Sequence, residues 1–327
     1  MRGVWLEDGM ARVRSDLPEP RPGEDEVVVA VTVAGICGTD LALLRGSPPE
    51  RPGGFAGILG HEFVGVVEAG PPEWLGRRVV SEINITCASQ PGPSECSACA
   101  AGRPNHCEVR SAIGIHGRDG VFADRVALPI SNLHEVPSGI SDEAACFVEP
   151  LAAAFRVLEQ VEIDADVRVI VIGPGRLGQL VARAIAATGN RPTVAGRSPA
   201  SVERARGAGL LAISTEDIGP GRFDVAIDCT GHPDGFALGR AALRAGGTLV
   251  IKSTYPGDLR VDARSLMVDE ISIVGSRCGP FPAAIEALDS GEVEVLDLID
   301  ATYPLSEALD AFAGASRPGV AKVLLRP

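Results

Sequence analysis

The chain has 327 residues, of which 45% are hydrophobic and 22% charged, which is enough apolar material for about two ordinary globular domains. Its formal net charge of −13 argues against a nucleic-acid partner, because proteins that bind nucleic acids carry basic surfaces. Among the 30 basic residues only Lys252 and Lys322 are lysines, an excess of arginine that we attribute to genome composition.

The sequence shows no recognisable targeting or membrane segment. Residues 1–8 contain acids where a signal peptide has an apolar core, and no apolar run reaches about 18 residues. We therefore expect a cytoplasmic protein with no membrane partner, in a compartment where thiols stay reduced. The eight cysteines are then expected to be ligands, core residues or nucleophiles rather than disulfides.

The first part of the chain, to about residue 145, has the composition of a β-rich domain. β-Branched residues dominate 27–33, and shorter strands are predicted at 63–68 and 78–81. Proline- and glycine-rich stretches at 47–54 and 89–94 predict loops between strands.

Near residue 150 the pattern changes to apolar strands that alternate with Ala- and Arg-rich helices. Such alternation is typical of a parallel, doubly wound sheet. The chain then returns to a mixed pattern after Pro280, so the predicted fold is α/β, with a β-rich domain at 1–150, a Rossmann-like domain at 151–276 and a C-terminal segment at 277–327. Strands are predicted at 167–172, 193–195, 223–228, 248–251, 271–274 and 322–325, and helices at 177–187 and 283–290.

A glycine motif lies between the first strand and the first helix of this second domain. Gly173, Gly175 and Gly178 form G-x-G-x-x-G, with Leu177 as its fifth residue. In this context the glycines permit a tight turn and close approach of the backbone to a pyrophosphate at the helix N-terminus. The motif therefore predicts a dinucleotide site, the alternative being a strand–helix turn without a ligand.

The end of the next strand predicts the type of cofactor. NAD-binding proteins carry an acid there, but this chain has Gly196, Arg197 and Ser198. Glycine leaves room, arginine can pair with a 2′-phosphate and serine can donate to it, so we predict NADP(H) rather than NAD(H). The alternative for Arg197 is an ordinary solvated side chain. Thr230 and Gly231 follow a later strand end and are expected near the cofactor.

Three residues with metal-binding side chains are widely separated in the sequence. Cys37, His61 and Glu149 together supply a thiolate, an imidazole and a carboxylate, which suffice for an open catalytic zinc site. Each residue alone is more often structural. Thr39, two residues after Cys37, offers a hydroxyl that could relay a proton.

A second cluster contains Cys87, Cys96, Cys99 and Cys107, four thiols within 21 residues. In a reducing compartment this spacing predicts a closed, four-coordinate structural zinc site. The alternative is a set of free or partly oxidised thiols.

The segments GICGTD at 35–40 and GHEFVG at 60–65, followed by the glycine motif, resemble the zinc-dependent medium-chain alcohol dehydrogenases over essentially the whole chain. Glu149 at the third ligand position resembles the sorbitol and glucose dehydrogenase branch. The resemblance implies a GroES-like catalytic domain at 1–150, a Rossmann domain, an active site between them, a C-terminal segment that returns to the catalytic domain, and a homo-oligomer, either dimer or tetramer.

The resemblance also implies roles for single residues. It implies that Cys37, His61 and Glu149 bind a catalytic zinc, that Glu62 is a nearby carboxylate able to exchange into the ligand shell, and that Lys322 lies by the cofactor. The chain departs from the family pattern in two places: Ala42 replaces a histidine of the usual proton relay, and the loop between Cys87 and Cys96 is longer.

The predicted function is hydride transfer between NADP and a secondary alcohol, with a polyol, sugar or cyclitol favoured as the small-molecule substrate. Zinc suits this chemistry because its Lewis acidity stabilises an alcohol oxygen as the hydride leaves. The loop at 45–57 is predicted to line the pocket. One alternative is an L-threonine-type amino-alcohol dehydrogenase, and another is a relative that binds the cofactor without turnover.

Overall fold

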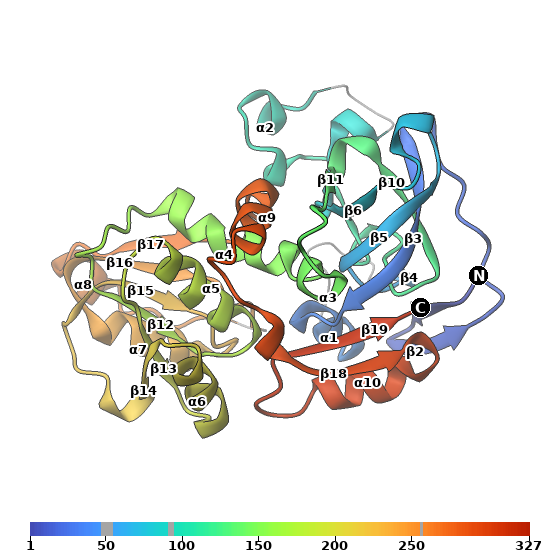
Figure 1. Cartoon of the computed structure of the whole chain (residues 1–327). Coiled ribbons are helices and arrows are strands. Elements are labelled where there is room, and N and C mark those ends of the chain that lie inside the picture. The colour runs from blue at the N-terminus through green and yellow to red at the C-terminus, as the bar shows by residue number, and fades with distance from the viewer. Residues whose placement is uncertain (47–54, 91–94, 256–257) are drawn as a thin grey trace. The chain divides into compact units, whose positions relative to one another are not determined.

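The computed structural model describes residues 1–46, 55–90, 95–255 and 258–327 (Figure 1). Its chain forms two compact units. The β-rich unit contains Met1–Glu149 and Val295–Pro327, and the parallel-sheet unit contains Pro150–Glu294. The sequence placed the end of the second domain at residue 276, whereas the parallel-sheet unit continues to Glu294 and includes the following helix. Residues 47–54, within the loop predicted to line a pocket, lie outside the described residues.

The β-rich unit is built around a sheet with the strand order β11-β6-β5-β3-β19-β18, in which β10 also pairs with β3. The central strand β3 has the sequence EVVVAVTVAG, whose β-branched side chains suit a pleated, buried surface. It lies antiparallel to β5, β10 and β19, so the C-terminal strand pairs with an N-terminal one. The strands of this sheet are β3 Glu26–Gly35, β5 Glu62–Ala69, β6 Arg78–Ser81, β10 Arg125–Pro129, β11 Leu133–Glu135, β18 Ile299–Pro304 and β19 Lys322–Arg326.

Two smaller sheets complete this unit, with the orders β2-β1-β4 and β7-β8-β9. The β1–β2 hairpin, which the sequence prediction missed, turns at Asp8 and Gly9, both with positive φ as a two-residue hairpin turn requires. The strands are β1 Gly3–Glu7, β2 Met10–Arg14, β4 Gly57–Ile58, β7 Asn84–Ile85, β8 Ser111–Ile113 and β9 Gly117–Arg118.

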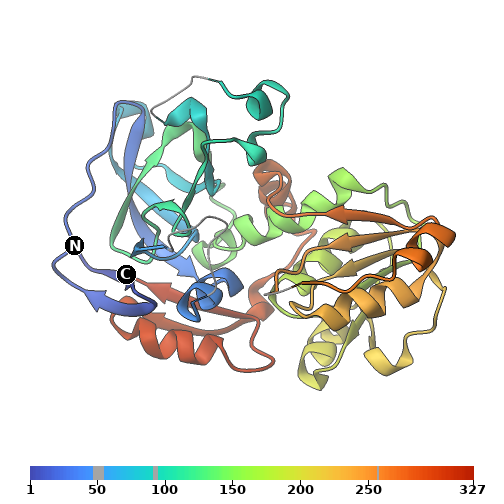
Figure 2. The ribbon, with the colours of Figure 1, turned by 180° about the vertical axis from the view of Figure 1, so that it is seen from behind.

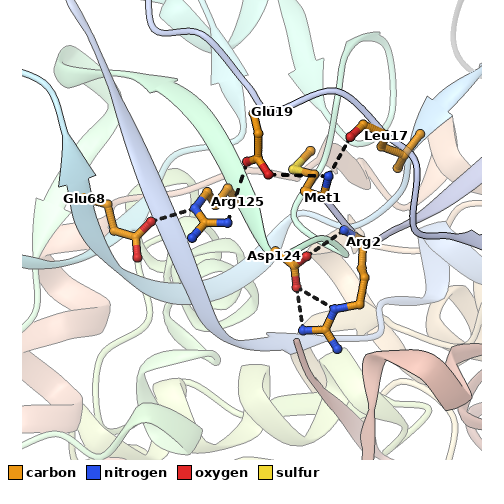
Figure 3. Close-up of polar contacts among 7 residues, drawn as sticks. All are labelled: Met1, Arg2, Leu17, Glu19, Glu68, Asp124 and Arg125. Carbon is orange, nitrogen blue, oxygen red and sulfur yellow. Dashed lines mark hydrogen bonds and ion pairs between the residues drawn. The ribbon is translucent and has the colours of Figure 1, made fainter.

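Polar contacts fix the first residues of the chain to this unit (Figure 3). The backbone nitrogen of Arg2 donates to Asp124 Oδ2 at 2.6 Å, and its guanidinium Nη2 donates to Asp124 Oδ1 at 2.7 Å. The Met1 nitrogen donates to Leu17 O at 2.6 Å. Nearby, Arg125 Nε donates to Glu68 Oε2 at 2.7 Å.

The core of the β-rich unit joins residues from both ends of the chain. Phe122 and Phe312 are buried with their ring centroids 5.8 Å apart, and Leu325 of β19 belongs to the same cluster. The C-terminal segment therefore contributes to the core on which the N-terminal strands pack. The helices of this unit are α1 Gly38–Leu44, α2 Ser97–Ala100, α3 Asp142–Ala145 and α10 Ala308–Ala315.

The parallel-sheet unit has the strand order β14-β13-β12-β15-β16-β17, and each neighbouring pair is parallel. Helices cover both faces, with α5 and α6 on one and α7 and α8 on the other (Figures 1 and 2). The order reverses between β12 and β15, as in a doubly wound fold, so the predicted fold class is confirmed. The strands are β12 Val169–Ile172, β13 Thr193–Gly196, β14 Leu211–Ser214, β15 Phe223–Asp228, β16 Leu243–Ile251 and β17 Ser272–Gly275. The helices are α4 Val148–Gln160, which begins in the β-rich unit, α5 Arg176–Ala187, α6 Pro199–Gly207, α7 Pro233–Ala242, α8 Ala263–Val268 and α9 Phe281–Asp289.

In the described part of the chain, no helix combines the length and the hydrophobicity needed to cross a bilayer.

Candidate metal and cofactor sites

The ends of two neighbouring strands bring Cys37, His61 and Glu62 together. Cys37 follows β3 and is the N-cap of α1, while Glu62 begins β5 opposite Gly35 of β3. One ligand atom from each of the three residues lies within 4.8 Å of the others. His61 and Glu62 are buried, whereas Cys37 is partly exposed. A thiolate, an imidazole and a carboxylate at this spacing match the ligand types that zinc prefers.

Asp40, which the sequence analysis did not single out, contacts both Cys37 and His61. Its Oδ2 accepts from the backbone nitrogen of Cys37 at 2.8 Å, and its Oδ1 lies 3.4 Å from His61 Nδ1. With Nδ1 facing Asp40, Nε2 is the ring nitrogen left for a metal, the arrangement usual for a histidine ligand. The position of an acid three residues after the helix N-cap was the signal that could have identified Asp40.

The electrostatics of the group favour a cation. Burial by itself lowers the pKa of His61, but the charges of Asp40 and Cys37 raise it well above its ordinary value. The site therefore stabilises positive charge, as a divalent metal would supply. Together with the donor set, this shows that the residues fit a zinc ion.

Lys322 pairs with Glu62 inside the β-rich unit. Its Nζ donates to Glu62 Oε2, and both side chains are almost completely buried. Burial lowers the pKa of Lys322, but attraction to Glu62 and to the thiols of Cys37 and Cys146 raises it above the usual value. A Cβ at Gly35 would lie 2.7 Å from Glu62 Oε2, so glycine at this position makes room for the pair.

Two other residues, Thr39 and Glu149, were also predicted for this site. Thr39 Oγ1 is 3.8 Å from Cys37 Sγ, so its hydroxyl lies beside this thiol. Glu149 is in the first turn of α4 and is partly buried, but it is not part of the 4.8 Å group. The structure thus groups Glu62 rather than Glu149 with Cys37 and His61.

The four cysteines of the second cluster lie together in the β-rich unit. One sulfur from each of them falls within 4.8 Å of the others, and Cys96 Sγ is 3.8 Å from Cys107 Sγ. Four sulfurs 2.3 Å from a zinc ion would form a tetrahedron with edges of about 3.8 Å. The backbone nitrogen of Cys87 donates to Cys107 Sγ at 3.2 Å, and backbone N–H groups of Glu108 and Cys99 lower the pKa of Cys96 to about 6. These cysteines therefore fit a structural zinc, although residues 91–94 of the connecting loop lie outside the described part. The cluster members are Cys87, Cys96, Cys99 and Cys107.

The glycine motif has the backbone geometry of a phosphate-binding turn. Gly173 has a φ of +90°, and a Cβ there would lie 2.8 Å from Thr230 Cα. A Cβ on Gly178 would lie 2.0 Å from Gly173 O, so this glycine allows α5 to approach the turn. In contrast, a Cβ on Gly175 would meet no protein atom within 4 Å. Open space at the N-cap of a helix is where a pyrophosphate would approach the backbone, so the motif fits a dinucleotide.

The β13–α6 turn packs beside this motif. A Cβ on Gly196 would lie 2.6 Å from Pro174 Cγ, so Gly196 permits the two turns to touch. Ser198 caps α6 by accepting from Ser201 N at 3.5 Å, and the side chain of Arg197 is exposed. The turn thus presents a solvated guanidinium next to the glycine motif.

Two further residues predicted near the cofactor, Thr230 and Gly231, follow β15. Asp228 Oδ1 accepts from Thr230 N at 2.9 Å, and Gly231 N donates to Ser253 Oγ at 2.8 Å. The second of these bonds joins the carboxyl ends of β15 and β16, the edge at which doubly wound sheets bind ligands. Leu177, in contrast, is partly buried in the first turn of α5.

Known proteins match both units. The family described as "Alcohol dehydrogenase GroES-like domain" matches residues 23–138, and "Zinc-binding dehydrogenase" matches residues 177–290. The sorbitol dehydrogenase of Halalkalibacterium halodurans is 30% identical, over 95% of this chain and 94% of that protein.

Solved structures share the whole fold. A protein of Sinorhizobium meliloti 1021, described as a zinc-binding dehydrogenase and bound to NADP, has a TM-score of 0.89 and 31% identity, covering 100% of this chain and 99% of that one. The short chain alcohol dehydrogenase RspB of Escherichia coli CFT073, complexed with NADH, has a TM-score of 0.89 and 25% identity over the same shares.

Proposed function

Since the chain belongs to the zinc-binding dehydrogenases that carry an alcohol dehydrogenase GroES-like domain, we propose that it transfers hydride between a secondary alcohol and NADP. The observation that carries this proposal is the donor group of Cys37, His61 and Glu62 in the β-rich unit. The open glycine turn at Gly175 in the parallel-sheet unit supports the cofactor part of the proposal.

In the proposed site Cys37, His61 and Glu149 would hold the catalytic zinc, and Glu62 would be the nearby carboxylate able to enter its ligand shell. When bound, zinc supplies Lewis acidity that polarises the carbon–oxygen bond of the substrate. Asp40 holds the imidazole of His61 in the orientation a ligand needs. The hydroxyl of Thr39, 3.8 Å from Cys37 Sγ, would accept the proton of the alcohol while it gives its own proton to solvent water.

Metal analysis tests the ligand assignment. We expect about two zinc ions per chain in the purified protein, one at each group of donors. Glu149→Ala should lose the catalytic zinc and keep the other, while Cys99→Ser should lose the structural one. Retention of both ions by Glu149→Ala would refute the role of Glu149 as a ligand. Loss of the catalytic zinc by Glu62→Ala in that case would assign the role to Glu62.

A polyol is the substrate class that we propose, with support from the similarity to a sorbitol dehydrogenase. A panel of polyols, simple secondary alcohols and L-threonine, assayed by absorbance of the reduced cofactor, separates the possibilities. Turnover of L-threonine above the polyols would favour the amino-alcohol alternative. Absence of turnover with every class would favour a relative that only binds the cofactor.

The cofactor is proposed to be NADP(H), selected by Arg197 and Ser198 at the β13–α6 turn. The similar NADP-bound structure supports this choice, although another similar protein was solved with NADH. Arg197→Ala should weaken NADPH binding by about tenfold or more and leave NADH binding unchanged, because only NADPH carries the 2′-phosphate. Arg191→Ala, which removes an exposed guanidinium before β13, is the matched control. Equal weakening of both cofactors would refute the assignment of Arg197.

A homo-oligomer is also proposed, formed through β17. This strand is at the edge of the parallel sheet, and it carries the exposed side chain of Ile273. Met267 and Val268 of α8 are 71% and 63% exposed. An open strand edge beside apolar side chains is a template for pairing with a second copy. Light scattering should show a dimer or a tetramer, and Ile273→Lys should shift it towards the monomer. A monomeric wild-type protein would refute this part of the proposal.

A further inference from the structure

Lysine is rare in this chain, and both lysines are buried. Lys252 and Lys322 stand against 28 arginines, and their exposed fractions are 8% and 2%. A composition bias that favours arginine leaves lysine only where a guanidinium cannot replace it. An ammonium is compact and donates in three tetrahedral directions, whereas a guanidinium is larger and planar. The pairing with Glu62 accounts for Lys322, but no role described so far accounts for Lys252.

The ammonium of Lys252 joins two elements of the parallel-sheet unit. Its Nζ donates to Ala153 O of α4 at 2.5 Å, to Arg277 O at 3.1 Å and to Ser276 Oγ at 3.3 Å. Ser276 and Arg277 directly follow β17. Three acceptors around one nitrogen suit the three donors of an ammonium.

The segment after β17 lies along one side of α4. At one end, Gln160 Nε2 donates to Gly275 O at 3.0 Å. At the other end, a Cβ on Gly279 would lie 2.0 Å from Ala152 O, so the two backbones are in contact. Residues 153 and 160 are seven apart and therefore lie on one face of the helix, and residue 152 adjoins residue 153. The Lys252 bonds therefore belong to a continuous line of contacts that runs towards the N-terminus of α4.

Lys252 is also anchored to the ligand-binding edge of the sheet. It follows β16, and its backbone nitrogen donates to Asp228 O at the end of β15, at 3.0 Å. The next residue, Ser253, donates to Asp228 Oδ1 at 2.9 Å and accepts from Gly231 N. One side of Lys252 thus connects to the turns predicted to contact the cofactor, and the other side connects to α4.

From this geometry we propose that Lys252 is a positioning residue for Glu149. Glu149 lies one helical turn before Ala153 on α4, so the bond from Lys252 to Ala153 O fixes the turn that presents the Glu149 carboxylate. This inference rests on the proposed role of Glu149 as a ligand of the catalytic zinc. It assigns to Lys252 no contact with the metal, the cofactor or the substrate.

The test measures how firmly the full-length protein holds its catalytic zinc. A chelator is titrated against the zinc-loaded protein, and the zinc retained per chain is determined by mass spectrometry. Release of the catalytic zinc is identified as the step of the titration that is missing in Cys37→Ser. Lys252→Met should release this zinc at a chelator concentration about tenfold lower than the wild type does. Lys252→Arg should do the same, because the guanidinium keeps the charge but does not fit the three acceptors.

A double-mutant cycle separates positioning from loss of stability. On a Glu149→Gln background, Lys252→Met should weaken zinc retention no further, since the carboxylate it positions is gone. Arg240→Met is the matched structural control. It removes a guanidinium of the same unit that donates to Ser265 O at 2.9 Å and pairs with Asp269, and it should lower the melting temperature without changing zinc retention.

Each contrary outcome is distinct. Wild-type retention in Lys252→Met or Lys252→Arg, where Glu149→Gln is impaired, would overturn the role of Lys252 and leave the proposed function standing. If Lys252→Met weakens zinc retention further on the Glu149→Gln background, or if Arg240→Met weakens it as much as Lys252→Met does, then Lys252 contributes only to the general stability of the protein. Normal retention in Glu149→Gln itself would overturn the proposed ligand and this inference with it.

Discussion

Replacing Lys322 by methionine tests the buried ion pair with Glu62. The change keeps the length of the side chain but removes the ammonium, which leaves the Glu62 carboxylate buried with its Oε2 unpaired. Removing one partner of a buried ion pair costs about 3–5 kcal/mol of unfolding free energy. With a urea m-value of about 2 kcal/mol per molar, the unfolding midpoint should fall by about 2 M.

Tryptophan fluorescence measures the unfolding of the β-rich unit, which contains the ion pair. The two tryptophans, Trp5 and Trp74, both belong to the β-rich unit, as do Lys322 and Glu62. The comparison is made on chelator-treated protein, because a cation beside Glu62 would replace the lost ammonium. The pKa of Lys322 is raised, so the pair contributes fully at pH values below 10.5, and its contribution is lost only as pH rises through the folded pKa. The loss should therefore be equal at pH 7 and pH 9.

Two further variants make the result decisive. Arg326→Met removes a cation from the same strand, β19, but its pair with Glu143 is 46% and 33% exposed and should cost only about 0–1 kcal/mol. In Glu62→Gln/Lys322→Met no charge is stranded, so most of the lost stability should return. A loss of under about 1 kcal/mol in Lys322→Met, or a double variant less stable than the single one, would refute this reasoning.

Three other predictions address the remaining features. Gly175→Ala should weaken NADPH binding by about tenfold, measured by fluorescence titration, and leave the melting temperature unchanged because its Cβ meets only open space. Gly178→Ala, whose Cβ would lie 2.0 Å from a backbone oxygen, should instead lower the melting temperature measured by calorimetry. A stable Gly175→Ala that binds NADPH normally would contradict the role of the glycine turn in binding the pyrophosphate. Asp40→Asn should weaken the affinity for the catalytic metal by about 10–100-fold through the orientation of His61, which chelator competition measures, and an unchanged affinity would contradict that role. Asp224→Asn should lower the melting temperature at pH 7, because hydrogen bonds from two arginines lower the pKa of Asp224. The stability that the Asp224 carboxylate contributes is present above its ordinary pKa of 3.8 and is lost as the pH falls, so calorimetry should show the two melting temperatures converging in acid. A difference in melting temperature that stays constant with pH would exclude this contribution.

The structure bears out strands and helices with strong local patterns and adds those without them. β15 Phe223–Asp228 and β6 Arg78–Ser81 have their predicted bounds, because apolar runs between turn residues define buried strands. The β1–β2 hairpin was missed, since alternation in MARVR is weak and only the Asp8-Gly9 turn signals it. α4 was missed as well, although its register matters for Glu149.

Residue type and spacing alone indicated the chemistry of this protein: the candidate donors Cys37, His61 and Glu149, the four-cysteine cluster and the G-x-G-x-x-G turn. Glu62 was implied only by the family resemblance. Which of these donors lie together depends on the three-dimensional fold. Strand pairing across long sequence separations places Glu62 beside Cys37 and Lys322 beside Glu62, 260 residues apart in the chain. Lys252 could be identified as a support residue only from the structure, because its burial and hydrogen-bond partners depend on contacts that no local pattern encodes.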